Sequence, residues 1–222
     1  MMGHAGMAAT AVRYLRSVGA PTTAGQPVDP LPRPDLRAVG EDERSPVEAA
    51  EFRRVLGNFA SGVTIVTAPA EPENGTGRPD PRAPSGPAGF ACQSFSSLSL
   101  DPPLVAFMVA RTSTTWPRIA RAGVFCVNIL GAGQGDLCRG FAVSGADKFA
   151  GVPYEPSPVT GSPLLTGVPA WIDCTIHTVH TGGDHLIVVG RVEALGAAED
   201  EDVTAAGPLL FHRGTFGSFG SL

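Results

Sequence analysis

The chain has 222 residues, a hydrophobic fraction of 43% and a formal net charge of −5 at pH 7. This length accommodates one sizeable core but not two large domains. The mild acidity and the lack of any run of Lys and Arg argue against a nucleic-acid partner, because such binding requires phosphate neutralisation. No apolar run approaches the roughly 20 residues of a membrane-spanning helix, so no membrane partner is expected.

None of the four cysteines belongs to a C-x-x-C pair, and each lies among apolar neighbours. We therefore expect buried free thiols in a reducing, cytoplasmic location, and no zinc or dithiol site. The cysteines are Cys92, Cys126, Cys138 and Cys174.

Two stretches stand outside the regular pattern. Residues 1–44 mix Ala, Gly, Pro and Arg without a sustained period, which predicts a disordered N-terminal arm. Residues 69–88 are rich in Pro and Gly and predict a long mobile loop between two strands. The folded domain is therefore assigned to residues 45–222.

The first regular element is predicted to be a helix. Residues 45–48, Ser-Pro-Val-Glu, match a capping box with proline at the first helical position. Gly62 is expected to end the helix. The apolar residues that fall on one helical face between these limits are Phe52, Val55, Leu56, Phe59 and Ala60.

Most of the remaining pattern predicts strands. Residues 63–67 are β-branched throughout, and residues 104–109 form the continuous apolar run of a strand buried on both faces. In 170–179, apolar and polar residues alternate as in a half-buried strand. Further strands are expected at 89–95, 124–130, 186–194 and 209–211.

Two short helices, one after Ser113 and one around Leu137, interrupt the strands, and residues 182–184 predict a hairpin turn. At least six strands with few helices indicate a mainly β fold with short helices. The architecture expected from this pattern is a closed or nearly closed β-barrel.

Several chemistries are excluded by their missing motifs. The chain has no P-loop and no G-x-S-x-G nucleophile turn, and residues 131–135 do not match the dinucleotide fingerprint. His177 and His180 lie three positions apart on a predicted strand. Their side chains should point to opposite faces, which disfavours a shared metal ion.

Three polar segments are candidates for a binding site. Residues 89–103 offer hydroxyl and amide groups that suit a flavin ring edge or a phosphate, although a self-satisfied Ser-rich turn fits them as well. Residues 111–117 place hydroxyls at a helix start, which suits either a phosphate or plain N-capping. His185 follows a tight turn, and it is either aimed at a ligand or simply half exposed on its strand.

Together these segments resemble a known family. Residues 52–67, 89–103, 125–130, 183–185 and 214–216 match its motifs in order. The chain is similar to the flavin reductase-like family, the small reductase partners of two-component flavin monooxygenases. The loops at 89–95 and 182–185 look most like those of the reductases that serve seco-steroid hydroxylases.

The resemblance implies a split β-barrel that forms a homodimer and binds FMN or FAD. It implies hydride transfer from NADH or NADPH to the flavin, which then diffuses to a partner monooxygenase of aromatic or steroid-derived phenols. The cofactors carry this chemistry, so no catalytic acid–base pair is expected.

The resemblance also assigns residues. Along the flavin ring it implies Cys92, Gln93, Ser94 and Phe95. At the ribityl and phosphate oxygens it implies Ser97, Ser99, Ser113 and Thr115. At the nicotinamide it implies His185 and Phe216.

The sequence departs from the family pattern at several points. Ala91 stands where Thr is common, and Phe216 stands where Tyr is usual, which removes a hydroxyl but keeps a stacking face. The long loop and the N-terminal arm are additional, and the usual C-terminal helix is expected to be missing. The alternative function is a split barrel that binds flavin or haem without turnover, with a hydrolase based on the Ser-rich segment as a weaker option.

Overall fold

The computed structural model describes residues 47–70, 86–145, 147–199 and 207–220. The predicted disordered arm, the first two residues of the predicted capping box and most of the predicted 69–88 loop lie outside these residues. The strands on either side of that loop, β2 (Thr64–Ala68) and β3 (Ala88–Cys92), pair with each other as antiparallel neighbours.

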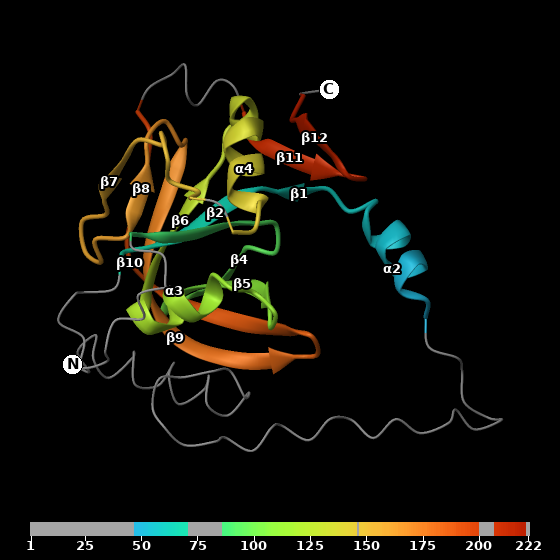
Figure 1. Cartoon of the computed structure of the whole chain (residues 1–222), viewed down its shortest axis with the longest axis horizontal. Helices are drawn as coiled ribbons and strands as arrows, with labels where there is room; N and C mark the ends of the chain where they lie inside the picture. Colours follow the sequence, from blue (N-terminus) through green and yellow to red (C-terminus); the bar gives the residue numbers. More distant parts are fainter. Residues whose placement is uncertain (1–46, 71–85, 146, 200–206, 221–222) are drawn as a thin grey trace.

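The central sheet has seven strands in the order β3-β2-β6-β9-β10-β5-β4, and every neighbouring pair is antiparallel (Figure 1). Its edge strands, β3 and β4, are consecutive in the chain and are joined only by residues 93–95. The sheet therefore curls until its two edges approach each other, which confirms the nearly closed, split barrel. The remaining strands are β4 (Ser96–Leu100), β5 (Pro103–Ala110), β6 (Val124–Ile129), β9 (Ala170–Gly182) and β10 (His185–Ala197).

Smaller elements surround the barrel. A three-stranded sheet has the order β1-β11-β12, and β7 pairs with β8. Two short helices lie where the sequence predicts them, and the second follows a single 3-10 turn. The bounds are β1 (Ser61–Gly62), β7 (Tyr154–Pro156), β8 (Pro163–Leu165), β11 (Leu209–His212), β12 (Thr215–Ser218), α3 (Trp116–Ala122), η1 (Ala132–Gln134) and α4 (Gly135–Ala142).

The core has two parts. Phe107 lies in the first, where its ring meets Phe125 and Trp116 edge-on at centroid distances of 5.2 and 6.2 Å. The second part lies between the sheet and α4, and includes Ile65 and Phe141. Strand β2 separates the two parts, so all of its residues are buried, as its β-branched sequence suggests.

Two strands differ from the burial that the sequence predicts. Strand β5 buries Val105, Phe107 and Val109 but leaves Met108 44% exposed, because no described helix covers its outer face. Strand β9 buries its polar Asp173 and Thr175 together with Cys174 and Ile176, whereas Ile172 is only partly buried. The loop at 157–162 covers that face, and the Asp173 carboxylate accepts bonds from the Thr160 N–H and hydroxyl.

The first helix is shorter than predicted. Helix α2 spans Ala49–Leu56, with Glu48 at its N-cap but no side-chain cap, and it ends at Gly57 rather than at Gly62. The end is fixed by Asn58, whose Nδ2 donates to two carbonyl oxygens of the last turn. Gly62 instead belongs to β1.

The apolar face of α2 is present but uncovered. None of the residues of α2 is buried, and Phe59 just beyond its end is 80% exposed. Figure 1 shows α2 standing apart from the barrel, beside the β11–β12 hairpin. Within the described residues, this face has no packing partner.

All four cysteines are buried and unpaired, which confirms the expectation of free thiols. Burial raises the pKa of the Cys92 thiol, so it stays protonated near neutral pH. In the described part of the chain, no helix is long and apolar enough to cross a membrane.

Candidate functional site

A cleft of about 670 Å³ opens where the β3–β4 turn, the start of α3, helix α4 and the β9–β10 hairpin tip converge. Its lining includes seven of the residues that the sequence assigns to the site, although they are scattered along the chain. These are Cys92, Gln93, Ser94, Ser113, Thr115, His185 and Phe216.

Ser94 holds the β3–β4 turn in place. Its hydroxyl oxygen accepts a hydrogen bond from the Met108 N–H at 2.9 Å and donates to the Met108 carbonyl at 3.0 Å. The Cys92 sulfur lies 3.3 Å from the same hydroxyl. Because these bonds occupy the Ser94 hydroxyl, a bound ring would meet chiefly the backbone of this turn and the exposed Gln93 amide.

The hydroxyls before α3 lie along one wall of the cleft. Ser113 acts as a cap, since its oxygen accepts from the Trp116 N–H at 3.2 Å. Its proton can still be donated to a ligand. Thr112, Thr114 and Thr115 line the same wall, so the segment offers several uncharged donors side by side.

Two cations on the cleft wall were not assigned a role from the sequence. Lys148 donates to the Gly89 carbonyl oxygen at 3.1 Å, and burial, helped by the nearby Arg118 charge, lowers the pKa of its ammonium. Arg139 stacks over the Phe216 ring, 5.3 Å from its centroid, and pairs with Asp136. Lys148 is the chain's only lysine, which was a signal, but nothing in the sequence placed it in the same cleft as the hydroxyls.

His185 occupies the hairpin tip. The hairpin is confirmed, with His185 paired to Gly182 across a turn in which Gly183 has φ +68°. His185 also pairs with Ala110 of β5, which anchors the tip to the barrel. Its Nδ1 lies 2.7 Å from the Asp184 carboxylate, and this contact lowers the pKa of Asp184. The ring's Nε2 remains available to a ligand.

Phe216 contributes an aromatic face to the cleft. It meets Phe211 edge-on at 5.5 Å and carries the Arg139 guanidinium on its ring. Both phenylalanines belong to the β11–β12 hairpin, which closes one side of the cleft.

Three of the assigned residues do not line the cleft. Residues 89–103 form two strands and a turn rather than one loop, and Ser97 and Ser99 lie on the edge strand β4. Phe95 instead packs against the barrel core. Alternating Ser and Leu residues support an extended edge strand as readily as a loop, which is why the sequence did not separate the two. Contact of Phe95, Ser97 and Ser99 with a flavin stays a prediction.

No group of three or more His, Cys, Asp or Glu side chains within the described ranges is arranged to hold a metal ion. His180 bonds to the Thr178 hydroxyl at 3.1 Å on the exposed part of β9. The polar groups that converge in the cleft are instead hydroxyls, amides and two cations, which suits a phosphorylated, planar ligand.

Barrel and cleft together define a split-barrel protein of the kind that binds flavins. Residues 56–220 match the model of the flavin reductase-like domain, and the chain belongs to that family.

Individual relatives agree with the family assignment. The chain is 45% identical to the reductase subunit HsaB of a flavin-dependent monooxygenase from Rhodococcus jostii, over 77% of each chain. It is 44% identical to a flavin reductase from Pseudomonas putida, over 84% of this chain and 99% of the relative. Among solved structures, it resembles the Streptomyces globisporus NADH:FAD oxidoreductase SgcE6, in complex with NAD and FAD fragments, with a TM-score of 0.65 and 31% identity over 83% of this chain and 98% of that one.

Proposed function

We propose that this chain is an NADH:flavin oxidoreductase that supplies reduced flavin to a two-component monooxygenase. The observation that carries the proposal is the single cleft in which a backbone turn, a row of hydroxyls, His185 and the Phe216 face converge. Family membership and the activities of the relatives support it. FAD and NADH are the finer assignment, following the Streptomyces relative.

The residues present fit a flavin. Lys148 pairs with no described carboxylate, so its charge is open to a phosphate, and Ser113 and Thr115 offer hydroxyls in the same cleft. The Gln93 amide and the backbone at 92–94 present donors and acceptors for a ring edge. When bound, the flavin and the nicotinamide would themselves supply the hydride-transfer chemistry.

The protein's part is therefore alignment and exclusion of water. We assign His185 Nε2 to the nicotinamide carboxamide and the Phe216 face to its ring, so that these side chains would align the nicotinamide with the flavin. Asp184 keeps the His185 ring oriented through Nδ1. No side chain has to transfer a proton in this scheme.

We propose a homodimer in which the apolar face of α2 is buried. Phe52, Leu56 and Phe59 are each more than half exposed, and Leu98 on the edge strand β4 is 55% exposed. Large apolar surfaces of this kind mark interfaces. Replacing Phe59 by Asp should convert the dimer to monomers in analytical ultracentrifugation, while Val143→Asp, at an exposed apolar position after α4, should leave the dimer intact.

The partner enzyme is proposed to receive reduced flavin by diffusion and to act on aromatic or steroid-derived phenols. The four free thiols support a reducing, cytoplasmic location.

The decisive assay combines purified protein, NADH and each flavin in turn. We expect NADH oxidation that depends on added FMN or FAD. Tight flavin binding without NADH consumption would instead select the non-catalytic binding protein.

A further inference from the structure

Arg139 is the only arginine among the described residues that lines the cleft. It projects from α4, which Figure 1 shows beside the β11–β12 hairpin. Its guanidinium carbon Cζ lies over the Phe216 ring, 5.3 Å from the ring centroid. Arg139 therefore sits on the aromatic face to which we assign the nicotinamide.

Two further contacts hold the guanidinium at this face. A Cβ on Gly135 would lie 3.5 Å from the Phe216 ring and 3.8 Å from a terminal nitrogen of Arg139, so the first turn of α4 packs close to both. Arg139 also bonds to the Asp136 carboxylate, at 2.7 Å. Asp136 does not line the cleft, so only the cation of this pair faces it.

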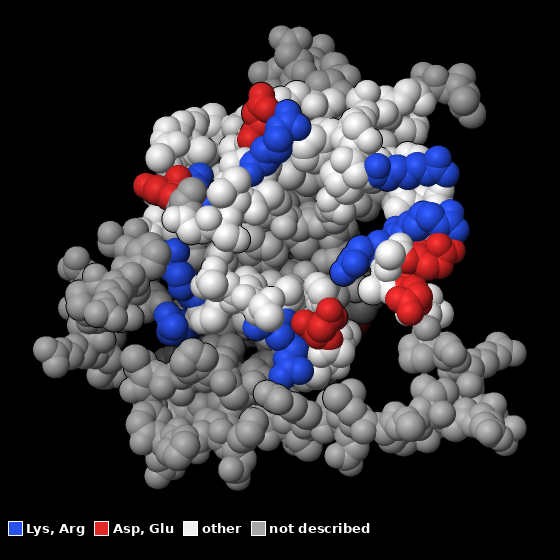
Figure 2. Space-filling view, turned by 45° about the vertical axis from the view of Figure 1, so that its right-hand side comes forward, with Lys and Arg blue, Asp and Glu red and all other residues white. Residues whose placement is uncertain are grey.

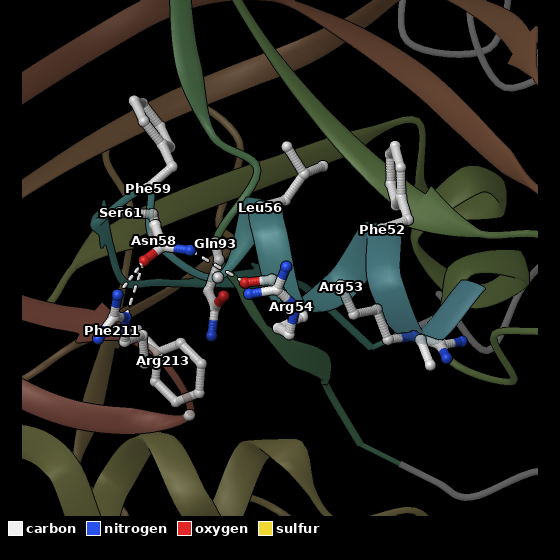
Figure 3. A pocket seen from close by; sticks show the side chains of 13 residues that line it. Phe52, Arg53, Arg54, Leu56, Asn58, Phe59, Ser61, Gln93, Phe211 and Arg213 are labelled. Atoms are coloured by element: carbon white, nitrogen blue, oxygen red, sulfur yellow. Dashed lines mark hydrogen bonds between the residues drawn. The ribbon is translucent and has the colours of Figure 1, made fainter. Parts of the chain in front are cut away.

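The walls of the cleft are positively charged. Arg139 and Lys148 line it, and no described Asp or Glu does. Figure 2 shows basic side chains around a hollow in one face of the molecule. Arg213, at the turn of the hairpin that carries Phe216, is held elsewhere, since its Nε donates to the Asn58 Oδ1 at 2.9 Å beside α2 (Figure 3). Arg139 is therefore the arginine whose charge acts inside the cleft.

The two forms of the nicotinamide differ in charge. Oxidation by the flavin, which accepts the hydride, turns the neutral dihydronicotinamide ring of NADH into the pyridinium cation of NAD+. An aromatic face attracts a planar cation, so the Phe216 ring alone would retain the product. A cation already held at that face repels the pyridinium ring, whereas the neutral ring of the substrate avoids this repulsion.

We propose that Arg139 discriminates between substrate and product: its guanidinium at the Phe216 face weakens binding of the pyridinium ring relative to the dihydronicotinamide ring, and so speeds the release of NAD+. The inference rests on the proposed function, because it takes the nicotinamide to bind at Phe216. Arg139 is in this role a specificity-determining residue and transfers neither hydride nor proton.

Two variants separate the charge of Arg139 from its size. Arg139→Gln removes the charge and Arg139→Lys keeps it, and both alter an exposed side chain whose ion pair adds little stability. Arg191→Gln is the matched control, because Arg191 is also an exposed arginine paired with a carboxylate, Glu193, but does not line the cleft. Equal thermal midpoints for the variants and the wild type would verify that folding is unaffected.

Binding is measured by calorimetry in the presence of saturating oxidised FMN. The probes are NAD+ and tetrahydronicotinamide adenine dinucleotide, a neutral analogue of NADH with no hydride to transfer. Both carry the same phosphates, so the ratio of their Kd values isolates the charge on the ring. We expect Arg139→Gln to lower the ratio of the Kd for NAD+ to the Kd for the analogue by about two- to fivefold, and Arg139→Lys and Arg191→Gln to keep the wild-type ratio.

An unchanged ratio in Arg139→Gln would overturn the proposal, whether both affinities stay the same or both fall together because Arg139 only attracts phosphate. An equal change in Arg139→Lys would also overturn it, since the effect would then not come from the charge. Wild-type protein that binds neither nucleotide would overturn it together with the assignment of the nicotinamide to Phe216.

Steady-state kinetics give a second readout. The Ki for NAD+ divided by the KM for NADH should fall in Arg139→Gln by a similar factor, because the product is then held more tightly relative to the substrate. A protein with the expected change in Kd ratio but no NADH oxidation would retain the discrimination by Arg139 and reject only the reductase function. A protein that oxidises NADH with an unaltered ratio would retain the reductase function and reject the role of Arg139.

Discussion

Ser94 and Met108 form the only described side-chain clamp between the β3–β4 turn and β5: one hydroxyl serves both backbone groups of Met108, at 2.9 and 3.0 Å. The turn itself lines the cleft through Gln93. The position of the candidate ring-binding backbone therefore depends on a hydroxyl that is not itself free to bind the ring.

Ser94→Ala should weaken both stability and flavin binding. Loss of this clamp is expected to cost about 1 kcal/mol, a fall of roughly 2–4 °C in Tm, because the Met108 groups lose their partner. Flavin affinity should fall several-fold as the turn loosens. Thermal unfolding and flavin titration measure the two effects. Ser96→Ala is the control, since Ser96 bonds only to its neighbour's carbonyl, and an equal effect there would refute the clamp.

His185→Ala should affect the nicotinamide and not the flavin. Removal of one hydrogen bond at Nε2 is expected to raise the KM for NADH by up to about tenfold, with flavin affinity close to that of the wild type. His180→Ala, on the same hairpin but outside the cleft, should leave both constants unchanged. A large loss of flavin binding in His185→Ala would show that the assignment is wrong.

Lys148 should link flavin-phosphate binding to pH. Burial lowers the pKa of its ammonium from 10.5, so the folded protein releases that proton at a lower pH than the unfolded chain. In the window between the two pKa values the unfolded state holds more protons, and this group's contribution to stability rises with pH. Below the folded pKa the buried charge is a cost.

Two consequences can be measured. Lys148→Gln is expected to keep or raise Tm while raising the Kd for FMN, because it removes both a buried charge and a phosphate partner. The wild-type affinity for FMN should fall as pH rises toward 10.5, whereas Lys148→Arg should retain affinity over that range, since arginine stays protonated. Identical pH profiles for wild type and Lys148→Arg would contradict a charge contact.

Gly190 and Gly140 should respond in opposite directions to alanine. A Cβ on Gly190 would clash with the buried Phe125 ring, so Gly190→Ala is expected to cost roughly 1–3 kcal/mol. Gly140 lies exposed in α4 with open space around its Cα, and Gly140→Ala should stabilise by about 0.5–1 kcal/mol. Denaturant unfolding separates the two, and a stabilised Gly190→Ala would overturn the packing argument.

Local patterns predicted most of the elements. The β-branched run at 63–67 became β2, the turn at 182–184 became a hairpin, and Gly123 ended α3 with φ +71°, since propensity and turn chemistry act within a few residues. The end of the first helix was misplaced because Asn58 caps its carbonyls and contacts the distant Arg213. Asn58 and Arg213 are 155 positions apart, so no local sequence pattern could reveal their contact.

The candidate site was predicted residue by residue but not as a cavity. Motif matches suggested the 92–94 turn, Ser113, Thr115, His185 and Phe216, all of which line one cleft. The resemblance of the 89–103 segment also assigned Ser97 and Ser99 to the flavin, and the structure places both on the edge strand β4, outside the lining of the cleft. Lys148 was missed because its approach to Gly89 joins positions 59 apart.

By itself, the order of apolar and β-branched residues determined that this chain folds into a mainly antiparallel barrel with buried free thiols, since secondary structure and burial follow from short-range periodicity. Which side chains meet was decided only by the closing of the sheet, which brings β3 beside β5 and sets α2 apart from the barrel. The cleft arises from those long-range contacts, because the charge and shape of a cavity depend on how distant segments of the chain pack and not on neighbours in sequence.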